Sequence, residues 1–269
     1  MPVQGVKQIS FENVKQCVDD FISNGINSTF KVPCFDGAIR NLNLYKLSED
    51  FLWEKIRTCE YETSAIGTYY EIYKIKDYER AGVKIQRGDV VVDVGANVGV
   101  FERWAYQNGA EKIYSFEPEM KNFKCLLENK SQKCIAHNVA VSGKKGLVTL
   151  FLDKSDGGHS LINNNINNTK TKNTQQIQSL TLNNIFDLVP KIDFLKVDVE
   201  GAELEIFEAA NEEKLSKIRN IVVEYHNMAF NFDDSKREIF IKKFTDLGFK
   251  FFLYFVDSIN HLQLIYFWK

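Results

Sequence analysis

The stretch from Val90 to Phe101, VVVDVGANVGVF, constrains the fold of this chain more than any other. Its β-branched run ends at Val94, glycines follow at Gly95 and Gly99, and an apolar segment with helical potential comes next. A nearly continuous apolar run of this length is typical of a buried parallel strand, so the pattern predicts strand, tight turn and helix. Glycines let the main chain turn sharply and let a ligand approach it closely. We therefore expect a ligand over the carboxyl end of this strand.

The acid before the turn limits which ligand this is. A dinucleotide-binding turn has the sequence G-x-G-x-x-G and places a pyrophosphate at a helix N-terminus. The spaced residues here are instead Asp93, Gly95, Asn97 and Gly99. A carboxylate at this point would repel a diphosphate but suits a cation, such as the amino group and sulfonium of S-adenosylmethionine. The alternative is that Asp93 only caps a helix.

A second acid, Glu117, closes the next apolar segment in the run Ser115–Glu119. Its distance from Gly99 is that at which a second-strand carboxylate holds ribose hydroxyls in nucleotide-binding sheets. The alternative is a solvated turn residue.

Composition narrows the class of protein. The 269 residues are 44% hydrophobic and 26% charged, which is ordinary for a globular enzyme. A net charge of −2 without a dense basic stripe argues against a nucleic-acid partner. Five cysteines without a C-x-x-C pair predict free thiols in the cytoplasm. There is no secretory pattern at the start and no apolar stretch near the ~20 residues of a membrane span, so no membrane partner is expected.

The chain is expected to have two parts. Residues 1–65 are predicted to form a lobe with a helix at Phe11–Ile22 and a hairpin within Ser28–Leu47 that turns at Asp36-Gly37. This lobe could bind the substrate or a second subunit, so a homo-oligomer is a possible assembly. Residues 66–269 are predicted to form an α/β domain with a doubly wound, mostly parallel sheet.

Strands are expected at Val90–Val94, Lys112–Phe116, Lys133–Ala140, Val148–Leu152, Phe194–Val199, Ile221–Glu224, Lys250–Val256 and Gln263–Trp268. Helices are expected at Val100–Asn108, Lys121–Lys130, Leu182–Leu188, Ala202–Ala209 and Lys236–Leu247. The last two strands are too close in sequence for a parallel crossover and should pair antiparallel. The polar segment Asn163–Gln178 is expected to be a flexible loop.

Four blocks of this sequence resemble the FkbM-type S-adenosylmethionine-dependent methyltransferases. They are Val92–Gly99, Phe116–Pro118, Asn138–Ser142 and Ile192–Glu203, in the family's order, within roughly Tyr69–Asn227. The glycine turn is shared by many methyltransferases, whereas the fourth block is specific. The resemblance implies a class I methyltransferase fold, Rossmann-like, with a seven-stranded sheet and one antiparallel strand near its edge.

The resemblance also implies roles for single residues. Asp93, Gly95, Asn97 and Gly99 would cradle the methionine part of the cofactor. Glu117 would accept hydrogen bonds from the ribose, and Asn138 would lie beside the adenine or, alternatively, only cap a strand end. Tyr70 and Glu71 fall where the family often has a Tyr/Glu cofactor contact, although this tyrosine could equally belong to the core.

The acids and histidines that follow the later strands are the candidates for chemistry. Asp198 and Glu200 follow one strand, and Glu224 and His226 end the next, so these ends should converge on the cofactor crevice. We expect His226, as a neutral imidazole with a pKa near ~6.5, or Asp198 to accept the proton of a hydroxyl acceptor, with Glu224 nearby.

Several alternatives accompany this assignment. His226 could instead satisfy a strand-end backbone group, and Glu200 could form a structural pair with Lys196. His159, near a glycine pair that could hinge a lid or form a turn, is a further candidate base. The two acids and the histidine could also hold Mg²⁺ or another hard cation.

The sequence therefore predicts an S-adenosylmethionine-dependent O-methyltransferase for a small polar acceptor. The resemblance implies a sugar of a glycan or a nucleotide-activated sugar, because the family often acts on saccharides and secondary metabolites. The alternatives are a nicotinamide-dependent oxidoreductase or epimerase, and a non-catalytic scaffold that keeps the cofactor pocket.

Overall fold

The computed structural model describes residues 29–33, 39–43, 65, 68–153, 158–162, 173–226, 233–257 and 262–269. The chain divides into two compact units, Met1–Ile56 and Arg57–Lys269. In the first unit β1 (Thr29–Pro33) pairs antiparallel with β2 (Ile39–Asn43), which confirms the predicted hairpin. Its turn and the expected helix Phe11–Ile22 lie outside the described residues.

The second unit is built on a seven-stranded sheet in the order β11-β12-β10-β9-β3-β4-β5. The strands are β3 (Val90–Val94), β4 (Lys112–Phe116), β5 (Cys134–His137), β9 (Phe194–Val197), β10 (Asn220–His226), β11 (Lys250–Asp257) and β12 (Leu262–Trp268). The pairs within β5-β4-β3-β9-β10 are parallel, and β12 runs antiparallel to both of its neighbours. This confirms the predicted doubly wound α/β sheet with an antiparallel strand near its edge.

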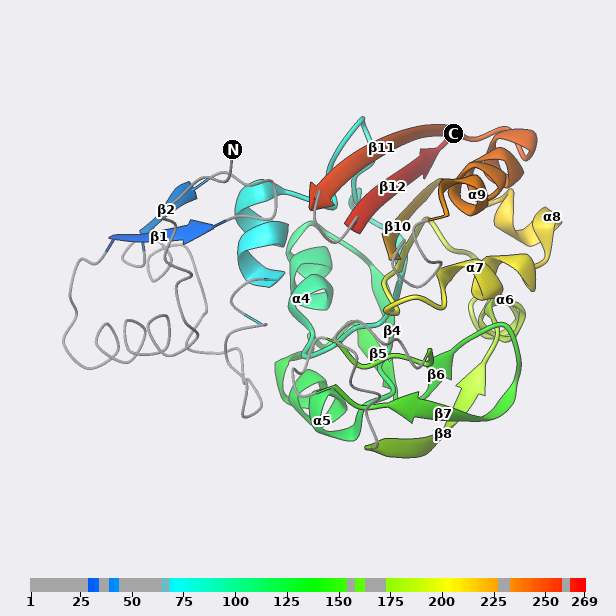
Figure 1. The fold of residues 1–269 in the computed structure, drawn as a ribbon, viewed down its shortest axis with the longest axis horizontal. Coiled ribbons are helices and arrows are strands. Elements are labelled where there is room, and N and C mark those ends of the chain that lie inside the picture. Colours follow the sequence, from blue (N-terminus) through cyan, green and yellow to red (C-terminus); the bar gives the residue numbers. More distant parts are fainter. Residues whose placement is uncertain are drawn as a thin grey trace. The chain divides into compact units, whose positions relative to one another are not determined.

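Helices cover both faces of the sheet (Figure 1). They are η2, a π-helix (Tyr70–Ile75), α4 (Val100–Gln107), α5 (Met120–Asn129), α6 (Leu182–Leu188), α7 (Glu203–Glu208), α8 (Glu212–Leu215) and α9 (Asp234–Asp246). Among the described residues, each helix is too short or too polar to span a bilayer.

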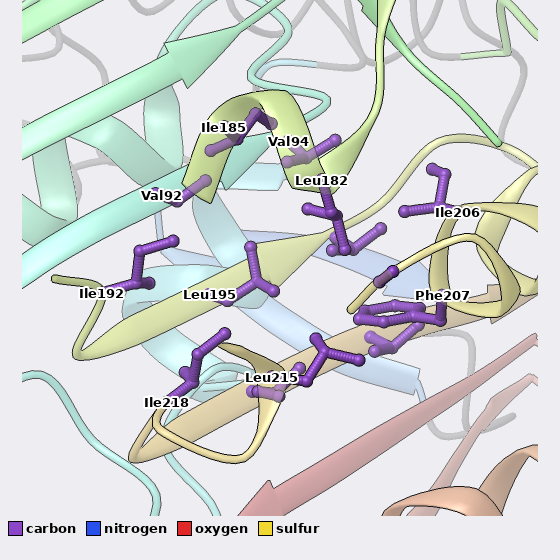
Figure 2. Close-up of a cluster of buried hydrophobic side chains, with 14 of the residues drawn as sticks. Val92, Val94, Leu182, Ile185, Ile192, Leu195, Ile206, Phe207, Leu215 and Ile218 are labelled. Carbon is purple, nitrogen blue, oxygen red and sulfur yellow. The ribbon is translucent and has the colours of Figure 1, made fainter. Parts of the chain in front are cut away.

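Side-chain alternation along the strands separates an apolar face from a partly charged one. On the first face, Leu195 of β9 packs with Leu182 of α6 and Phe207 of α7 in a large buried cluster (Figure 2). On the second, Phe194 packs near Phe101 of α4, with tilted rings whose centroids are 6.0 Å apart. The charged residues of β3, β9 and β10 alternate onto this second face and lie toward the strands' carboxyl ends.

A three-stranded sheet in the order β6-β8-β7 adjoins the domain. Its strands are β6 (Ala140–Val141), β7 (Gly146–Phe151) and β8 (Thr174–Leu180). The prediction of one strand over Lys133–Ala140 is therefore wrong, since β5 and β6 belong to different sheets. The expected loop Asn163–Gln178 is also wrong in part, because its last five residues belong to β8. In β8, Ile177 and Ser179 are buried while Gln176 and Gln178 are exposed, which is the period of a half-buried strand.

The cysteines differ from the prediction of free thiols. Cys134 is free and buried. Cys125, on α5, is disulfide-bonded. The prediction of free thiols therefore holds for Cys134 but not for Cys125.

Candidate active site

The turn after β3 has the close backbone packing that its glycines predict. Gly95 has φ +79°, and a Cβ built on it would lie 1.7 Å from the backbone oxygen of Asp198. Gly99 has φ +93°, and Asn97, at φ +48°, also adopts the left-handed region. The amides of Gly95 and Ala96 donate to the carbonyl of Phe116 at 3.0 Å each. The ends of β3, β4 and β9 are thus held together at one point.

A buried lysine joins the same strand ends. The Lys196 ammonium lies 3.3 Å from Oδ1 of Asp93 and 3.3 Å from Oδ2 of Asp198, and it donates to the carbonyl of Gly95 at 2.5 Å. Burial alone would lower the pKa of Lys196, but the carboxylates of Asp198 and Asp93 outweigh burial and raise it. Lys196 is therefore a fixed cation beneath the turn.

These contacts show how Asp93 is held in the turn. Its side chain is fully buried, paired with Lys196, and absent from the wall of the neighbouring cleft. A carboxylate with its own counter-ion inside the sheet stabilises the turn. The sequence signal for this pair is a lysine within the otherwise apolar run of β9.

Glu117 lies where the sequence places it, at the end of β4. Its Oε2 accepts a hydrogen bond from the amide of Asn97 at 2.8 Å, and its Oε1 accepts one from the amide of Glu119 at 2.8 Å. Burial raises its pKa to about 7. Each carboxylate oxygen has a second lone pair for a further donor.

A cleft with about 580 Å³ of empty space, continuous with solvent, lies over these strand ends. Its wall is formed by Val94, Gly95, Asn97, Phe116, Glu117, Pro118, Asn122, Ala140, Val141, Leu150, His159, Leu161, Asp198, Val199 and Glu200. The turn, Glu117 and the acids after β9 thus line one cleft, as the sequence predicts.

Asn138, expected to contact the cofactor, is absent from the described wall of this cleft. Asn138 donates through Nδ2 to the carbonyls of Glu117 and Pro118, at 2.9 Å each, so it holds the chain behind the cleft. It does not line the cleft, which fits the strand-end alternative better than a place beside the adenine. The side chain of Tyr70 lies outside what the structure describes.

The structure brings Asp198, Glu224 and His226 together as expected. One ligand atom from each lies within 4.8 Å of the others. The hydroxyl of Tyr78 donates to Oε2 of Glu224 at 3.2 Å. Glu71 of η2 is close enough to Asp198 to contribute to this acidic region, and burial followed by the charges of Asp77 and Asp198 raises its pKa to about 8.

The surroundings of His226 favour its cationic form over the neutral imidazole that the sequence suggests. Its Nδ1 lies 2.7 Å from Oε1 of the fully buried Glu203, and its Nε2 lies 3.3 Å from Oε2 of Glu200 and 4.0 Å from Oε1 of Glu224. Burial alone would lower the pKa of His226, but the charges of Glu200 and Glu203 outweigh it and raise the pKa well above 6.5. A ring held between carboxylates on both nitrogens is arranged as a cation.

Glu200 does not pair with Lys196, contrary to the structural alternative. Its backbone has φ +57°, an uncommon conformation for a residue other than glycine, and its carbonyl accepts a hydrogen bond from the hydroxyl of Ser160 at 2.6 Å. Because the backbone turns here, the chain leaves the direction of β9, and the Glu200 side chain contacts His226 instead. Sequence spacing does not reveal such a turn.

Comparisons with known proteins agree with the geometry. The family model described as "Methyltransferase FkbM domain" matches residues 93–251, more than half of the chain. The chain is 26% identical over 192 residues to 31-O-demethyl-FK506 methyltransferase FkbM of Streptomyces tacrolimicus, covering 60% of this chain and 74% of that protein. It is 26% identical over 165 residues to hexuronic acid methyltransferase AglP of Haloferax volcanii, covering 58% and 66%.

Among solved structures, precorrin-6y C5,15-methyltransferase of Geobacter metallireducens matches with a TM-score of 0.39 at 14% identity, over 69% of this chain and 82% of that one. The family match favours methyl transfer over the nicotinamide-dependent alternative and over a non-catalytic scaffold. The chain belongs to the family of methyltransferases with an FkbM domain, and it is an S-adenosylmethionine-dependent methyltransferase.

Proposed function

We propose that this protein transfers the methyl group of S-adenosylmethionine to a hydroxyl group of a sugar, either in a glycan or in a nucleotide-activated sugar. The observation that carries the proposal is that the glycine turn, Glu117 and the acids Asp198 and Glu200 line one cleft. The name of the relative AglP, a hexuronic acid methyltransferase, supports a saccharide acceptor.

The residues present fit the methyl donor. Gly95 and Asn97 provide backbone that a ligand can approach closely, and Glu117 provides acceptor lone pairs for ribose hydroxyls. The apolar walls at Phe116 and Leu150 suit an adenine ring. When bound, S-adenosylmethionine supplies a methyl group activated by its cationic sulfur. We assign the electrostatic complement of that cation to Asp198 and its acidic neighbours rather than to Asp93.

The negative charge of the cleft limits which chemical group can be the methyl acceptor. Asp198 and Glu200, with side chains 24% and 34% exposed, line the cleft, and Glu224, 21% exposed, lies next to them. A carboxylate acceptor would add a negative charge beside them, whereas a neutral hydroxyl would not. A hydroxyl must lose its proton during methyl transfer, and nearby carboxylates can accept it. We therefore infer an ether-forming O-methyltransferase.

Mass spectrometry of a matched substrate panel tests this function. The protein is incubated with S-adenosylmethionine carrying a deuterated methyl group and with nucleotide-activated neutral hexoses, amino sugars and hexuronic acids. We expect one labelled methyl group on a neutral sugar, stable to mild alkali as an ether is. Labelling only of a hexuronic acid, lost in alkali as a methyl ester is, would overturn the assignment to a hydroxyl.

The donor site is checked separately by calorimetry with S-adenosylhomocysteine. Glu117→Gln should weaken this binding about tenfold, because a charge-assisted hydrogen bond contributes roughly 1.5–3 kcal/mol. Glu111→Gln is the matched control, since Glu111 is 68% exposed and remote from the cleft wall. Absence of binding by the unaltered protein would contradict the donor site itself.

A further inference from the structure

The acids expected to act on the acceptor are already engaged by other groups. Asp198 is paired with the buried ammonium of Lys196 at 3.3 Å, and a neighbouring cation disfavours protonation of a carboxylate. Glu224 accepts a hydrogen bond from Tyr78 and does not line the cleft. Neither carboxylate is well placed to take a proton from an acceptor.

His159, which lines the cleft, and His226 are also poorly suited as bases. In His159 the Nδ1 atom accepts a hydrogen bond from the amide of Asp153 at 3.1 Å. The neutral ring then carries its proton on Nε2, which makes that nitrogen a donor. His226 is held as a cation between carboxylates. A cationic imidazole has no lone pair with which to accept a proton.

Glu200 has the access that these groups lack. Its side chain lines the cleft and is 34% exposed, the most exposed of the three carboxylates at the ends of β9 and β10. The Ser160 hydroxyl fixes its carbonyl, and its left-handed backbone sets the direction of the residue. Backbone conformations of this kind gather at functional sites when the surroundings hold them in place.

His226 and Glu203 hold the Glu200 carboxylate from behind. The fully buried Glu203 binds Nδ1 of His226 at 2.7 Å, which fixes the plane of the ring. The opposite nitrogen, Nε2, then lies 3.3 Å from Oε2 of Glu200. In this chain of contacts, Glu203 holds the His226 imidazolium, and the imidazolium contacts one oxygen of Glu200. The other oxygen of Glu200 is left for the acceptor.

We propose that Glu200 is the catalytic base of this enzyme. His226, which is itself held by Glu203, is a positioning residue that orients the Glu200 carboxylate. The inference rests on the proposed function, because it requires a hydroxyl acceptor. The O–H bond of the acceptor breaks and its proton passes to the Glu200 carboxylate. The acceptor oxygen bonds to the methyl carbon, the carbon–sulfur bond breaks, and its electron pair stays on sulfur as S-adenosylhomocysteine is released.

The electrostatics of Glu200 suit this task. Burial, opposed by the charge of His226, raises its pKa to about 7, near the pH at which a general base works best. The charged groups that act on it from neighbouring segments are His226 and Glu224 of β10, Lys196 of β9, Asp198 after that strand, and Glu203 of α7. The turnover number should therefore rise with pH through about 7.

Glu200→Gln is the first test, because it keeps the shape and removes the base. We expect kcat to fall about 10²–10⁴-fold, and the rise of kcat near pH 7 to disappear. S-adenosylhomocysteine affinity should stay within about twofold, which also shows that the variant folds. Glu200→Asp keeps the charge but withdraws it by one methylene, so it should lose rate yet retain a pH-dependent kcat.

His226→Gln separates positioning from catalysis. Loss of the cation should raise the pKa of Glu200, so the rise of kcat should move to higher pH while residual activity persists. A merely structural histidine would lower kcat without moving the profile.

A spectroscopic readout needs no methyl donor. Nitrogen chemical shifts of His226 in the protein alone should show a cationic ring at pH 7, and Glu200→Gln should lower the pKa of that ring. The Glu200 assignment is overturned if the unaltered enzyme methylates a hydroxyl while Glu200→Gln keeps its kcat and pH profile. Failure of the unaltered enzyme to methylate any hydroxyl would instead remove the proposed function.

Discussion

Gly95 is the residue at which the turn after β3 packs directly against the backbone that follows β9. The backbone oxygen of Asp198 occupies the space that any Cβ at this position would need. A lysine ammonium beneath it donates to its carbonyl, so Gly95 is fixed from both sides. The requirement for glycine therefore comes from tertiary packing as well as from backbone conformation.

Gly95→Ala should destabilise the protein and weaken donor binding together. A positive φ alone costs an alanine roughly 1 kcal/mol, and the contact at 1.7 Å with Asp198 must also be relieved by moving β3 from β9. We expect a loss of at least about 3 kcal/mol by urea denaturation and at least tenfold weaker S-adenosylhomocysteine binding. Gly248→Ala is the control, since Gly248 has φ +84° with nothing within 4 Å. Equal losses in the two variants would contradict the packing argument.

Single residues were predictable where their role depends on order along the chain. Glu117 and the glycines follow their strands directly, so a strand–turn–helix pattern places them. The roles of His226 and Asn138 depend on what surrounds them after folding. Glu203 approaches His226 from a helix 23 positions earlier in the chain, and no local pattern shows such a contact.

At the scale of elements, the short three-stranded sheet supports the wall of the cleft. Ile177 of β8 packs in a small buried cluster with Ala140, Val148 and Leu150. Ala140 and Leu150 also line the cleft. Through these contacts, the polar segment that contains β8 supports the wall of the binding site.

Ile177→Ala should lower the free energy of unfolding by about 2 kcal/mol, the low end for a buried large-to-small substitution, because its cluster is small. It should also weaken S-adenosylhomocysteine binding a few-fold, since the cavity lies behind Leu150. Gln178→Ala, at an exposed position of the same strand, should change both quantities little. Denaturation curves and calorimetry on the three proteins measure this; unaltered binding in Ile177→Ala would show that the small sheet is independent of the cleft.

Elements with strong apolar patterns were predictable almost to the residue. The structure has β3, β4 and α6 with the expected bounds, because each buries a continuous or periodic apolar run. β8 was missed because three glutamines dilute its alternation, and Ile177 gains its burial from packing against β6 and β7. Tertiary pairing, rather than composition, makes that segment a strand.

At the scale of the whole molecule, buried acids make stability depend on pH. Folding raises the pKa of Glu71 to about 8 and the pKa values of Glu117 and Glu200 to about 7, mainly through burial. A carboxyl group with a raised pKa binds its proton more tightly in the folded state. Its contribution to the free energy of unfolding is therefore complete below the unfolded pKa near 4.5 and is lost as pH rises toward 8. The raised pKa of His226 acts in the same direction.

The melting temperature of the protein alone should therefore fall between pH 6 and pH 8.5. A fall of at least about 3 °C is expected, the shift that roughly 1 kcal/mol produces in a domain of this size. Glu71→Gln should flatten part of the slope, whereas Glu111→Gln, at an exposed position, should not. Differential scanning calorimetry in buffers of matched ionic strength provides the measurement, and a melting temperature that rises over this interval would contradict the assignment.

The lysine shared by the turn and the acidic wall has a practical meaning for protein engineering. The Lys196 ammonium contacts both the carbonyl of Gly95, in the turn assigned to the methyl donor, and the carboxylate of Asp198. A substitution that changes one of these contacts will therefore disturb the other. Retargeting the enzyme to new acceptors should leave Lys196 intact. Libraries should instead vary Leu161, which borders the cleft beside the Ser160 anchor and lies outside the ion-pair network.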